Sequence, residues 1–454
     1  MTESSRFEPW KTLVLYAEAG EHSELEAFVV AIGPSETFRS LLRLEPAQRE
    51  LVLTTLSPTE AAEIMEEIPG EHAADFIEQL SPSDAASIVD AMESAEQADL
   101  LSDMSEVEAE AILARMDPQR AADARELIRY ARYEAGGLMV TEFLAYPETA
   151  LVRDVLDGLS DWVEAQPDEE AHVYVVSATG ILIGGLDLRG LVLTRRTTPL
   201  SEVVKPPRFV SETATLDELD NLFECHQLSS VAVVDSHQKL LGVLRRDDLS
   251  RALQERADAD YLKSQGIVSG DEIRAMPVLT RARRRLSWLS LNIFLNIIAA
   301  SVIAMYEDTL RAVIALAVFL PIVSDMSGCS GNQAVAVSMR ELSLGIVKPY
   351  EAVRVWMQEI SVGLMNGLVL GCLIAAAAWL WKGNVYLGLV VGVALAVNTM
   401  IAVSLGGTVP LLLKRFKVDP AVASGPILTT VTDMCGFFLV LGLATAMLPK
   451  LTLG

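Results

Sequence analysis

The chain has 454 residues, of which 51% are hydrophobic, and its formal net charge is −25 at pH 7. Such a charge excludes a role that depends on a basic surface, as nucleic-acid binding does, but it is compatible with the binding of small cations. The acidic residues are unevenly distributed along the chain. Residues 1–285 contain 27 Lys and Arg and 53 Asp and Glu, whereas residues 286–454 contain 9 Lys and Arg and 8 Asp and Glu. We therefore predict a multi-domain membrane protein with an acidic soluble region followed by an apolar membrane region.

The cysteines and the amino terminus narrow the possible class of protein further. None of the four cysteines stands in a CxxC or Cys/His ligand spacing, so neither a disulfide framework nor a zinc site is predicted. The first residues, MTESSRFEPWK, lack the basic and apolar regions of a signal peptide, so we expect the soluble region to stay in the cytoplasm. No nucleophile–base pair or phosphate-binding loop is visible in the sequence, and we do not expect an enzyme.

Residues 1–135 are predicted to form an acidic, all-α superhelical domain. Between residues 30 and 118, an apolar residue followed by a turn or helix-cap signal recurs every 12 residues. Pairs such as Ser57-Pro58 are typical of a helix N-terminus. Each unit is a helix too short to be stable alone, so neighbouring units must stack, and solenoids of this kind usually serve as interaction surfaces. The apolar residues of the period are Ile32, Leu44, Leu56, Ile68, Leu80, Met92, Met104 and Met116.

Residues 136–256 are predicted to form an α/β domain with two copies of a strand, turn, strand and helix. Runs of β-branched residues at 172–176 and 230–234 are each followed by a small turn and a second apolar strand, and the two blocks recur about 58 residues apart. The segment resembles a tandem pair of CBS domains, with the closing LLGVLRRDDL as its most characteristic element. CBS pairs commonly sense adenine nucleotides or ions and pass a conformational change to an attached channel or enzyme.

The CBS resemblance implies a nucleotide site, with ATP as an optional cofactor. In nucleotide-binding CBS domains a carboxylate just before the final helix accepts hydrogen bonds from ribose hydroxyls, and Asp248 stands at that position in the second copy. In the first copy Gly190 takes this position, although Arg189 is retained. A simple helix cap explains Asp248 equally well, so both interpretations stay open.

Residues 257–285 are predicted to form a connecting helix. Its basic end, LTRARRR, is also expected to anchor the chain at the cytoplasmic side of the membrane.

Residues 286–454 are predicted to form a five-helix transmembrane domain, because five segments have the roughly 20 apolar residues that a span needs. The second of these spans is irregular. Basic residues gather before the first span, between the second and third, and between the fourth and fifth. This pattern places the amino terminus in the cytoplasm and the carboxyl terminus outside the cell membrane. The predicted spans are Leu286–Tyr306, Leu310–Met339, Val355–Trp381, Val385–Leu413 and Ala421–Leu448.

Two carboxylates fall at membrane depth, where an ionisable group is costly unless it faces water or a partner. Asp433 lies in the middle of the fifth span, and Asp325 lies in PIVSDMSGCSGNQ, a polar stretch that we expect to break the second helix and line a wet cavity. Carboxylate, hydroxyl and amide oxygens suit a hydrated divalent cation, above all Mg²⁺, which sheds its waters reluctantly. The alternative for each aspartate is a buried structural carboxylate.

Over essentially the whole chain, the sequence resembles the MgtE family of magnesium channels. The segments that carry the resemblance are GCSGNQ in the second span and DPAVASGPILTTVTDMCG in the fifth. It implies a homodimer whose pore lies between these two spans of both subunits, with Asp433 as the ion-binding aspartate. The further pore ligands that we assign are Asp325, Asn332 and Thr430. The family usually has GNxGNQ, and Cys329 replaces its first Asn here, which bears on selectivity or conduction.

The resemblance also implies regulation by magnesium in the cytosol. Mg²⁺ bound to the acidic domains screens their mutual repulsion and closes the pore. Each cytosolic carboxylate that we nominate has a solvated surface group as its alternative. The candidates are Glu60, Glu63, Glu67, Asp90, Asp247, Asp258 and Asp260.

Two other functions remain open on the sequence. One is an ion-coupled carrier or exporter of divalent cations, in which a titrating Asp433 carries protons. The other is a membrane-bound sensor of cytosolic magnesium or nucleotide that conducts nothing and signals through the superhelical domain.

Overall fold

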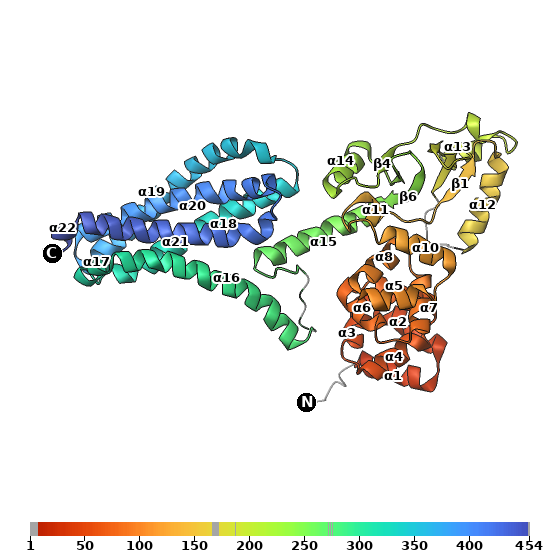
Figure 1. Cartoon of the computed structure of the whole chain (residues 1–454), viewed down its shortest axis with the longest axis horizontal. Helices are drawn as coiled ribbons and strands as arrows, with labels where there is room; N and C mark the ends of the chain where they lie inside the picture. The colour runs from red at the N-terminus through yellow and green to blue at the C-terminus, as the bar shows by residue number, and fades with distance from the viewer. Residues whose placement is uncertain are drawn as a thin grey trace, which may run out of the picture. The chain divides into compact units, whose positions relative to one another are not determined.

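The computed structural model describes residues 8–165, 172–186, 188–270, 272, 274 and 276–452. It divides into two compact units, residues up to Gln254 and residues from Glu255 onward (Figure 1). The first unit contains a helical domain followed by two small sheets, and the second consists of helices. The predicted fold class, an all-α repeat domain, an α/β pair and a helical membrane domain, is therefore confirmed.

Helices α3 to α10 follow the twelve-residue period of the sequence. From α3 to α10, each helix begins 12 residues after the one before it, and most begin with Pro, which suits the first helical position because that backbone N–H would have no partner. Ser57 and Ser81 cap α5 and α7 by accepting the backbone N–H three residues on. The helices are α1 Pro9–Ala19, α2 His22–Ile32, α3 Pro34–Leu41, α4 Pro46–Thr55, α5 Pro58–Glu66, α6 Gly70–Ile77, α7 Pro82–Ala91, α8 Ser94–Asp103, α9 Glu106–Leu113 and α10 Pro118–Leu127.

The apolar residue of each period is buried between helices, which explains why the repeat is kept. From Leu44 to Met116, all seven of these side chains are at most 9% exposed, whereas Ile32 at the start of the stack is only partly buried. Helices pack chiefly on the second helix along the chain, so α5 contacts α7 and α6 contacts α8. Odd-numbered and even-numbered helices thus form two layers of one stack, coloured red to orange in Figure 1.

The α/β part contains two three-stranded sheets of the same topology. In each sheet the first strand pairs with the second in parallel, and the second pairs with the third antiparallel, with a register shift near its end. The repetition predicted for residues 136–256 is therefore present in three dimensions. The elements are α11 Ala135–Leu138, β1 Leu144–Pro147, α12 Val152–Ala165, β2 Val173–Val176, β3 Leu182–Gly185, α13 Leu188–Leu193, η1 Leu200–Glu202, β4 Phe209–Ser211, α14 Leu216–His226, β5 Ser230–Val234 and β6 Leu240–Arg245.

The connecting segment differs from the single helix expected at 257–285. Helix α15 spans Arg246–Ser264 and ends at Gly266, which takes a left-handed conformation with φ of 86°. The N–H groups of Gly266 and Ile267 bond to the carbonyls of Lys263 and Leu262, a closing pattern that stops a helix. The basic run LTRARRR instead belongs to the start of the next helix, which begins after Pro277.

The second unit holds the helices of the predicted membrane domain. In the described part of the chain, four helices are long and apolar enough to cross a membrane, namely α16, α19 with the short η2 before it, α20 and α21. The elements are α16 Val278–Met305, α17 Glu307–Ala312, α18 Leu316–Ser343, η2 Pro349–Glu351, α19 Ala352–Lys382, α20 Val385–Arg415, α21 Pro420–Ala446 and α22 Leu448–Thr452.

Helix α18 is the predicted second span, and the break that we expected in it is wrong. The helix is continuous for 28 residues, through both its internal Pro321 and the polar stretch. Several hydroxyls of this stretch donate to the carbonyl four residues earlier, as Ser327 does to Val323 and Ser330 to Met326. The polar residues therefore need no break in the backbone, because short side chains can be satisfied inside an intact helix.

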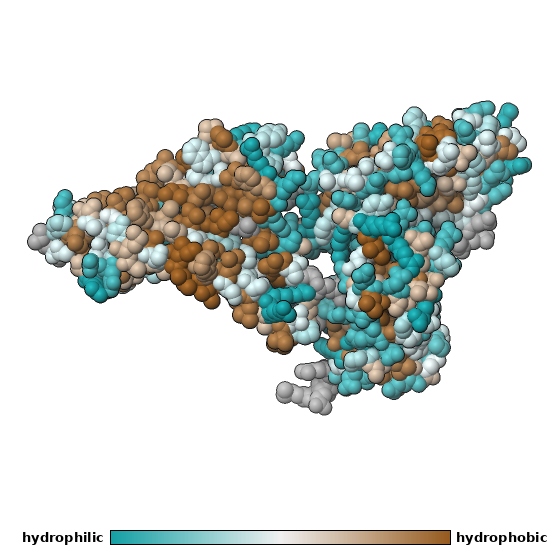
Figure 2. Space-filling model, viewed as in Figure 1, coloured by the Kyte–Doolittle hydropathy of each residue, from teal (hydrophilic) through white to brown (hydrophobic). Residues whose placement is uncertain are grey.

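Helix α20 lies at the centre of this unit. Of its most apolar stretch, 67% is buried, against 11% for α16 and 17% for α19. The exposed apolar side chains of the outer helices form the brown surface of Figure 2, as expected of helices that face lipid. Helices α19 and α20 touch through their backbones, since a Cβ at Gly367 would lie 2.4 Å from the Ala396 carbonyl oxygen.

Candidate functional site

Asp433 lies inside α21 and is half-buried. Its Oδ1 accepts a hydrogen bond from the hydroxyl of Ser324 on α18. Asp419 caps the same helix by accepting the N–H of Ala421 at 2.9 Å, and Pro420 takes the first helical position. The carboxylate thus stands on a helix whose start is capped, and it accepts a hydrogen bond from the polar stretch of α18.

A second polar contact to α21 comes from Asn398 of α20, which the sequence analysis did not identify. Asn398 is fully buried, and its Nδ2 donates to the backbone carbonyl of Thr432 at 3.1 Å. Gly436, one turn further along α21, leaves the space for it, since a Cβ there would lie 2.7 Å from Nδ2. A lone asparagine in an otherwise apolar span was the available signal, because such residues usually hydrogen-bond across helices.

The other pore candidates lie on or near this site without contacting Asp433 by a hydrogen bond in the described residues. Asp325, Cys329 and Asn332 are exposed and share one face of α18, four and three residues apart. Gly328 on the same helix has no atom within 4 Å of where a Cβ would stand. Thr430 donates instead to the Pro426 carbonyl of its own helix at 2.7 Å. The described residues contain no group of three His, Cys, Asp or Glu that could hold a metal ion.

Three of the four candidate carboxylates of the repeat domain lie on or at the end of α5, and the fourth lies on α7. Glu63 and Glu67 are exposed. Glu60 accepts the Ser57 hydroxyl at 2.5 Å, and its pKa is raised by burial and by the neighbouring Glu26 carboxyl. Asp90 accepts the N–H of Asp117 at 3.1 Å, which ties the end of α7 to the start of α10.

The remaining cytosolic candidates lie on α15. Asp247 and Asp258 are exposed. Asp260 is half-buried, and its pKa is raised chiefly by burial, with a smaller opposing effect from Arg256. In the same unit Lys263 forms an ion pair with Asp419 at 3.3 Å, so the end of α15 is linked to the first turn of α21.

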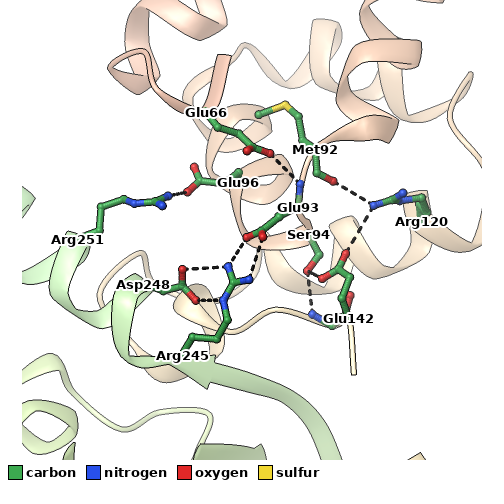
Figure 3. Close-up of polar contacts among 11 residues, drawn as sticks. Glu66, Met92, Glu93, Ser94, Glu96, Arg120, Glu142, Arg245, Asp248 and Arg251 are labelled. Atoms are coloured by element: carbon green, nitrogen blue, oxygen red, sulfur yellow. Dashed lines mark hydrogen bonds and ion pairs between the residues drawn. The ribbon is translucent and has the colours of Figure 1, made fainter. Parts of the chain in front are cut away.

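Asp248, the nucleotide candidate, is held by an arginine. Its carboxylate accepts from Arg245 Nε at 2.7 Å and from an Arg245 terminal nitrogen at 3.1 Å. The same guanidinium donates to both oxygens of Glu93, at the start of α8, as Figure 3 shows. Asp248 stands in the first turn of α15, and its carboxylate takes part in a bridge between the repeat domain and the second CBS copy. The side chain of Arg189, on α13, lies outside the described residues.

Further polar contacts surround this bridge, some within the repeat domain and some between it and residues 136–256 (Figure 3). Arg251 donates to Glu96 at 2.5 Å, and Ser94 donates to Glu142 at 2.7 Å. Glu66 accepts the backbone N–H of Glu93 at 3.0 Å, and burial raises its pKa to about 7. Carboxylates outnumber arginines in this cluster, so part of the negative charge is left without a cationic partner within it.

Comparison with known families gives three matches along the chain. The model described as MgtE, a divalent cation transporter, matches residues 320–443, which include both Ser324 and Asp433. The MgtE intracellular N domain matches residues 32–133, and the CBS domain matches residues 200–255.

Curated relatives and solved structures were also found. The magnesium transporter MgtE of Thermus thermophilus is 33% identical over 440 residues, which are 95% of this chain and 96% of the relative. The magnesium transporter MgtE of Bacillus subtilis is 32% identical over 339 residues, 74% of each chain. Among solved structures, the cytosolic domain of the Mg²⁺ channel MgtE in complex with ATP is 27% identical, with a TM-score of 0.46, and covers 53% of this chain and 98% of that chain.

Proposed function

The chain belongs to the MgtE family of magnesium transporters, and from this premise we propose that it is a channel through which Mg²⁺ enters the cell down its electrochemical gradient. Transporters of this kind are not an enzyme class. The observation that carries the proposal is Asp433, a carboxylate in the middle of an apolar helix that receives a hydrogen bond from the polar stretch of α18. Such residues are rarely incidental, because burying a charge in a membrane is costly.

The chemistry of the site favours a hydrated divalent cation. Asp433 and the neighbouring hydroxyl, amide and carboxylate oxygens are hard ligands, which Mg²⁺ prefers. Because Mg²⁺ keeps several waters, a single carboxylate with surrounding oxygens is sufficient to hold it without a closed cage of protein ligands. We propose Asp433 as the principal ligand, with Asp325, Asn332 and Thr430 contributing further oxygens.

We propose that the working unit is a homodimer. The face of α18 that carries Asp325, Cys329 and Asn332 is exposed in the single chain. An exposed carboxylate and amide on a membrane helix are unfavourable in lipid, so this face needs either water or a second protein surface. A second copy of the chain, placed with the same face opposite, would enclose a water-filled path and bring two copies of Asp433 towards one ion.

We propose that the cytosolic domains close the pore when magnesium is plentiful. Residues 1–285 carry 53 Asp and Glu against 27 Lys and Arg, so two such regions repel each other until cations screen them. The seven cytosolic candidates remain proposed ligands for this ion.

We also propose that ATP binds at Asp248. The ATP would have to compete with Arg245 for the Asp248 carboxylate.

We propose one role for each domain, in the order of the chain. Residues 1–135 form the acidic sensor, 136–256 the CBS pair, 257–285 the connection and 286–454 the pore domain. The basic residues of the loops favour a cell-membrane orientation with the amino terminus inside and the carboxyl terminus outside.

The experiment that separates a channel from an ion-coupled carrier is Mg²⁺ uptake into proteoliposomes with an imposed membrane potential. We expect uptake to follow the potential alone. A requirement for an opposing proton or sodium gradient would contradict the channel and support the carrier. Uptake no greater than in empty liposomes at any potential would support the non-conducting sensor.

A further inference from the structure

Two hydrogen bonds from two different helices converge on consecutive residues of α21. Ser324 of α18 donates to the Asp433 side chain, and Asn398 of α20 donates to the Thr432 carbonyl. Both donors lie in apolar helices, where a polar group without a partner is unfavourable. Asp433 is therefore fixed twice, through its carboxylate and through the backbone beside it.

Ser324 differs in this respect from three of the other four serines of its helix, while the fourth, Ser338, donates to the Gly407 carbonyl of α20 at 2.8 Å. Ser327, Ser330 and Ser343 each donate to the carbonyl four residues earlier. That local bond is the usual way in which a serine is satisfied inside a helix. The hydroxyl of Ser324 instead crosses to α21, and the bond is charge-assisted when Asp433 is ionised, which makes it one of the stronger kinds of hydrogen bond.

We propose that Ser324 and Asn398 are positioning residues for Asp433, an inference that rests on the proposed role of Asp433 as the ion ligand. Ser324 holds Oδ1, so the carboxylate cannot rotate freely and offers a defined edge to a passing hydrated cation. Discrimination between Mg²⁺ and Ca²⁺ depends on the rigidity of a site, since Mg²⁺ demands near-octahedral geometry and Ca²⁺ tolerates irregular geometry. The Ser324 bond therefore sets selectivity as well as affinity.

Asn398 acts on the backbone of the same turn. The Thr432 carbonyl lies directly before Asp433, and the close approach of Asn398 to Gly436 fixes α20 against the turn that follows. The Asn398 Oδ1 atom has no hydrogen-bond partner among the described residues, so within them the bond of Nδ2 to Thr432 is the one that satisfies this buried amide. Loss of that bond allows α21 to shift relative to α20 and displaces Asp433 along with it.

The test for Ser324 is Mg²⁺ and Ca²⁺ uptake by the full chain in proteoliposomes. We expect Ser324→Ala to raise the half-saturating Mg²⁺ concentration roughly tenfold, equivalent to about 1.4 kcal/mol, and to lower the Mg²⁺/Ca²⁺ uptake ratio. Ser324→Thr keeps the hydroxyl and should stay within about twofold of the wild type. Ser327→Ala is the matched control, since it removes a buried hydroxyl from the same helix that bonds only to its own backbone.

The Ser324 results decide the inference in either direction. A wild-type Mg²⁺/Ca²⁺ ratio in Ser324→Ala would overturn it, as would equal losses in Ser324→Ala and Ser327→Ala, or failure of Ser324→Thr to restore selectivity. Thermal unfolding of each variant separates a loss of folded protein from a change at the site.

Asn398 is tested by Asn398→Leu, which keeps the branched shape and removes the donor, with Thr399→Val as its control. Thr399 is equally buried, and its hydroxyl has no partner in the described part of the chain, so its removal should leave uptake unchanged. We expect Asn398→Leu to lower the Mg²⁺/Ca²⁺ ratio as Ser324→Ala does. If Asn398→Leu is not recovered folded, Asn398→Ser, too short to reach Thr432, takes its place, and a wild-type ratio in that variant overturns the role of Asn398.

Asp433→Ala distinguishes failure of the proposed ligand role of Asp433 from failure of the proposed positioning role of Ser324. If this variant transports like the wild type, the proposed function of Asp433 fails regardless of Ser324. If it abolishes uptake while Ser324→Ala leaves affinity and selectivity unchanged, only the positioning role fails.

Discussion

Arg245 is one of the residues that join the repeat domain to the second CBS copy. Its side chain is 21% exposed and lies between Glu93 and Asp248. We predict that Arg245→Met lowers the free energy of unfolding of the cytosolic region by about 2–4 kcal/mol, because it leaves two half-buried carboxylates without their cation. Scanning calorimetry of the full chain in detergent would measure the loss.

Arg251→Met is the matched control for this prediction. Arg251 also pairs with a carboxylate of α8, but its side chain is 51% exposed, so the solvent screens the pair. Its loss should cost less than about 1 kcal/mol. Equal destabilisation by the two substitutions would contradict the assignment of Arg245 as the principal bridge.

The raised pKa of Glu66 leads us to predict that the free energy of unfolding depends on pH. Burial first, and then the charges of Glu93 and Glu96, raise its pKa from 4.5 to about 7, while the hydrogen bond from the Glu93 N–H and the charge of Arg251 oppose the shift. The native state therefore holds a proton that the unfolded chain has already released, so stability falls as the pH rises between these two values. From pH 5 to pH 8 the wild type should lose about 2–3 kcal/mol relative to Glu66→Gln, measured by thermal unfolding.

The control for the Glu66 prediction is Glu63→Gln, which alters an exposed carboxylate on the same helix. If burial of Glu66 is the cause, Glu63→Gln should not reproduce the effect of Glu66→Gln. A pH-independent difference between the wild type and Glu66→Gln would show that folding does not raise the pKa of Glu66.

At the residue scale, Asp433 could be predicted from the sequence because a carboxylate inside an apolar run is conspicuous and costly. Its partners could not. Ser324 looks like any serine that bonds back to its own helix, and Asn398 lies in another span, so only the packing of three helices reveals that both converge on one turn of α21. Arg245 was missed for the same reason, since Glu93 is 152 residues away in the chain.

At the scale of elements, the twelve-residue period predicts a specific pattern of core positions. Leu56 is 5% exposed between helices, whereas Leu51 on α4 is 36% exposed. We predict that Leu56→Ala lowers the unfolding free energy by about 2–4 kcal/mol and Leu51→Ala by less than about 1 kcal/mol. Denaturant unfolding followed by circular dichroism would measure both, and similar losses would contradict the period as the basis of packing.

The elements also show where sequence patterns mislead. The helix starts of the repeat were predictable because Ser-Pro and related pairs act locally, as caps and first-turn residues. The expected break in α18 was wrong because the polarity of a segment does not reveal whether its hydroxyls find partners within the helix. The extent of the connecting helix was misjudged because the left-handed Gly266 ends α15 well before the basic run that begins α16.

At the scale of the whole molecule, the uneven distribution of charge correctly separated an acidic part from an apolar one. Composition alone sufficed there, since membrane helices exclude charge and a solvated repeat does not. The same composition cannot tell which of many carboxylates hold ions, because that depends on which of them are brought together in space. We propose that the acidic region regulates a pore in the apolar region, and that Asp433 is the ion site of this pore.

The most direct test of this central claim is uptake of divalent ions by the wild type and Asp433→Ala in proteoliposomes, with the magnesium concentration on the cytosolic side varied. The account predicts rapid Mg²⁺ uptake by the wild type when cytosolic magnesium is low and strong inhibition when it is raised. Asp433→Ala should remain at background under both conditions. Wild-type uptake by Asp433→Ala, or wild-type uptake that does not respond to cytosolic magnesium, would contradict the account.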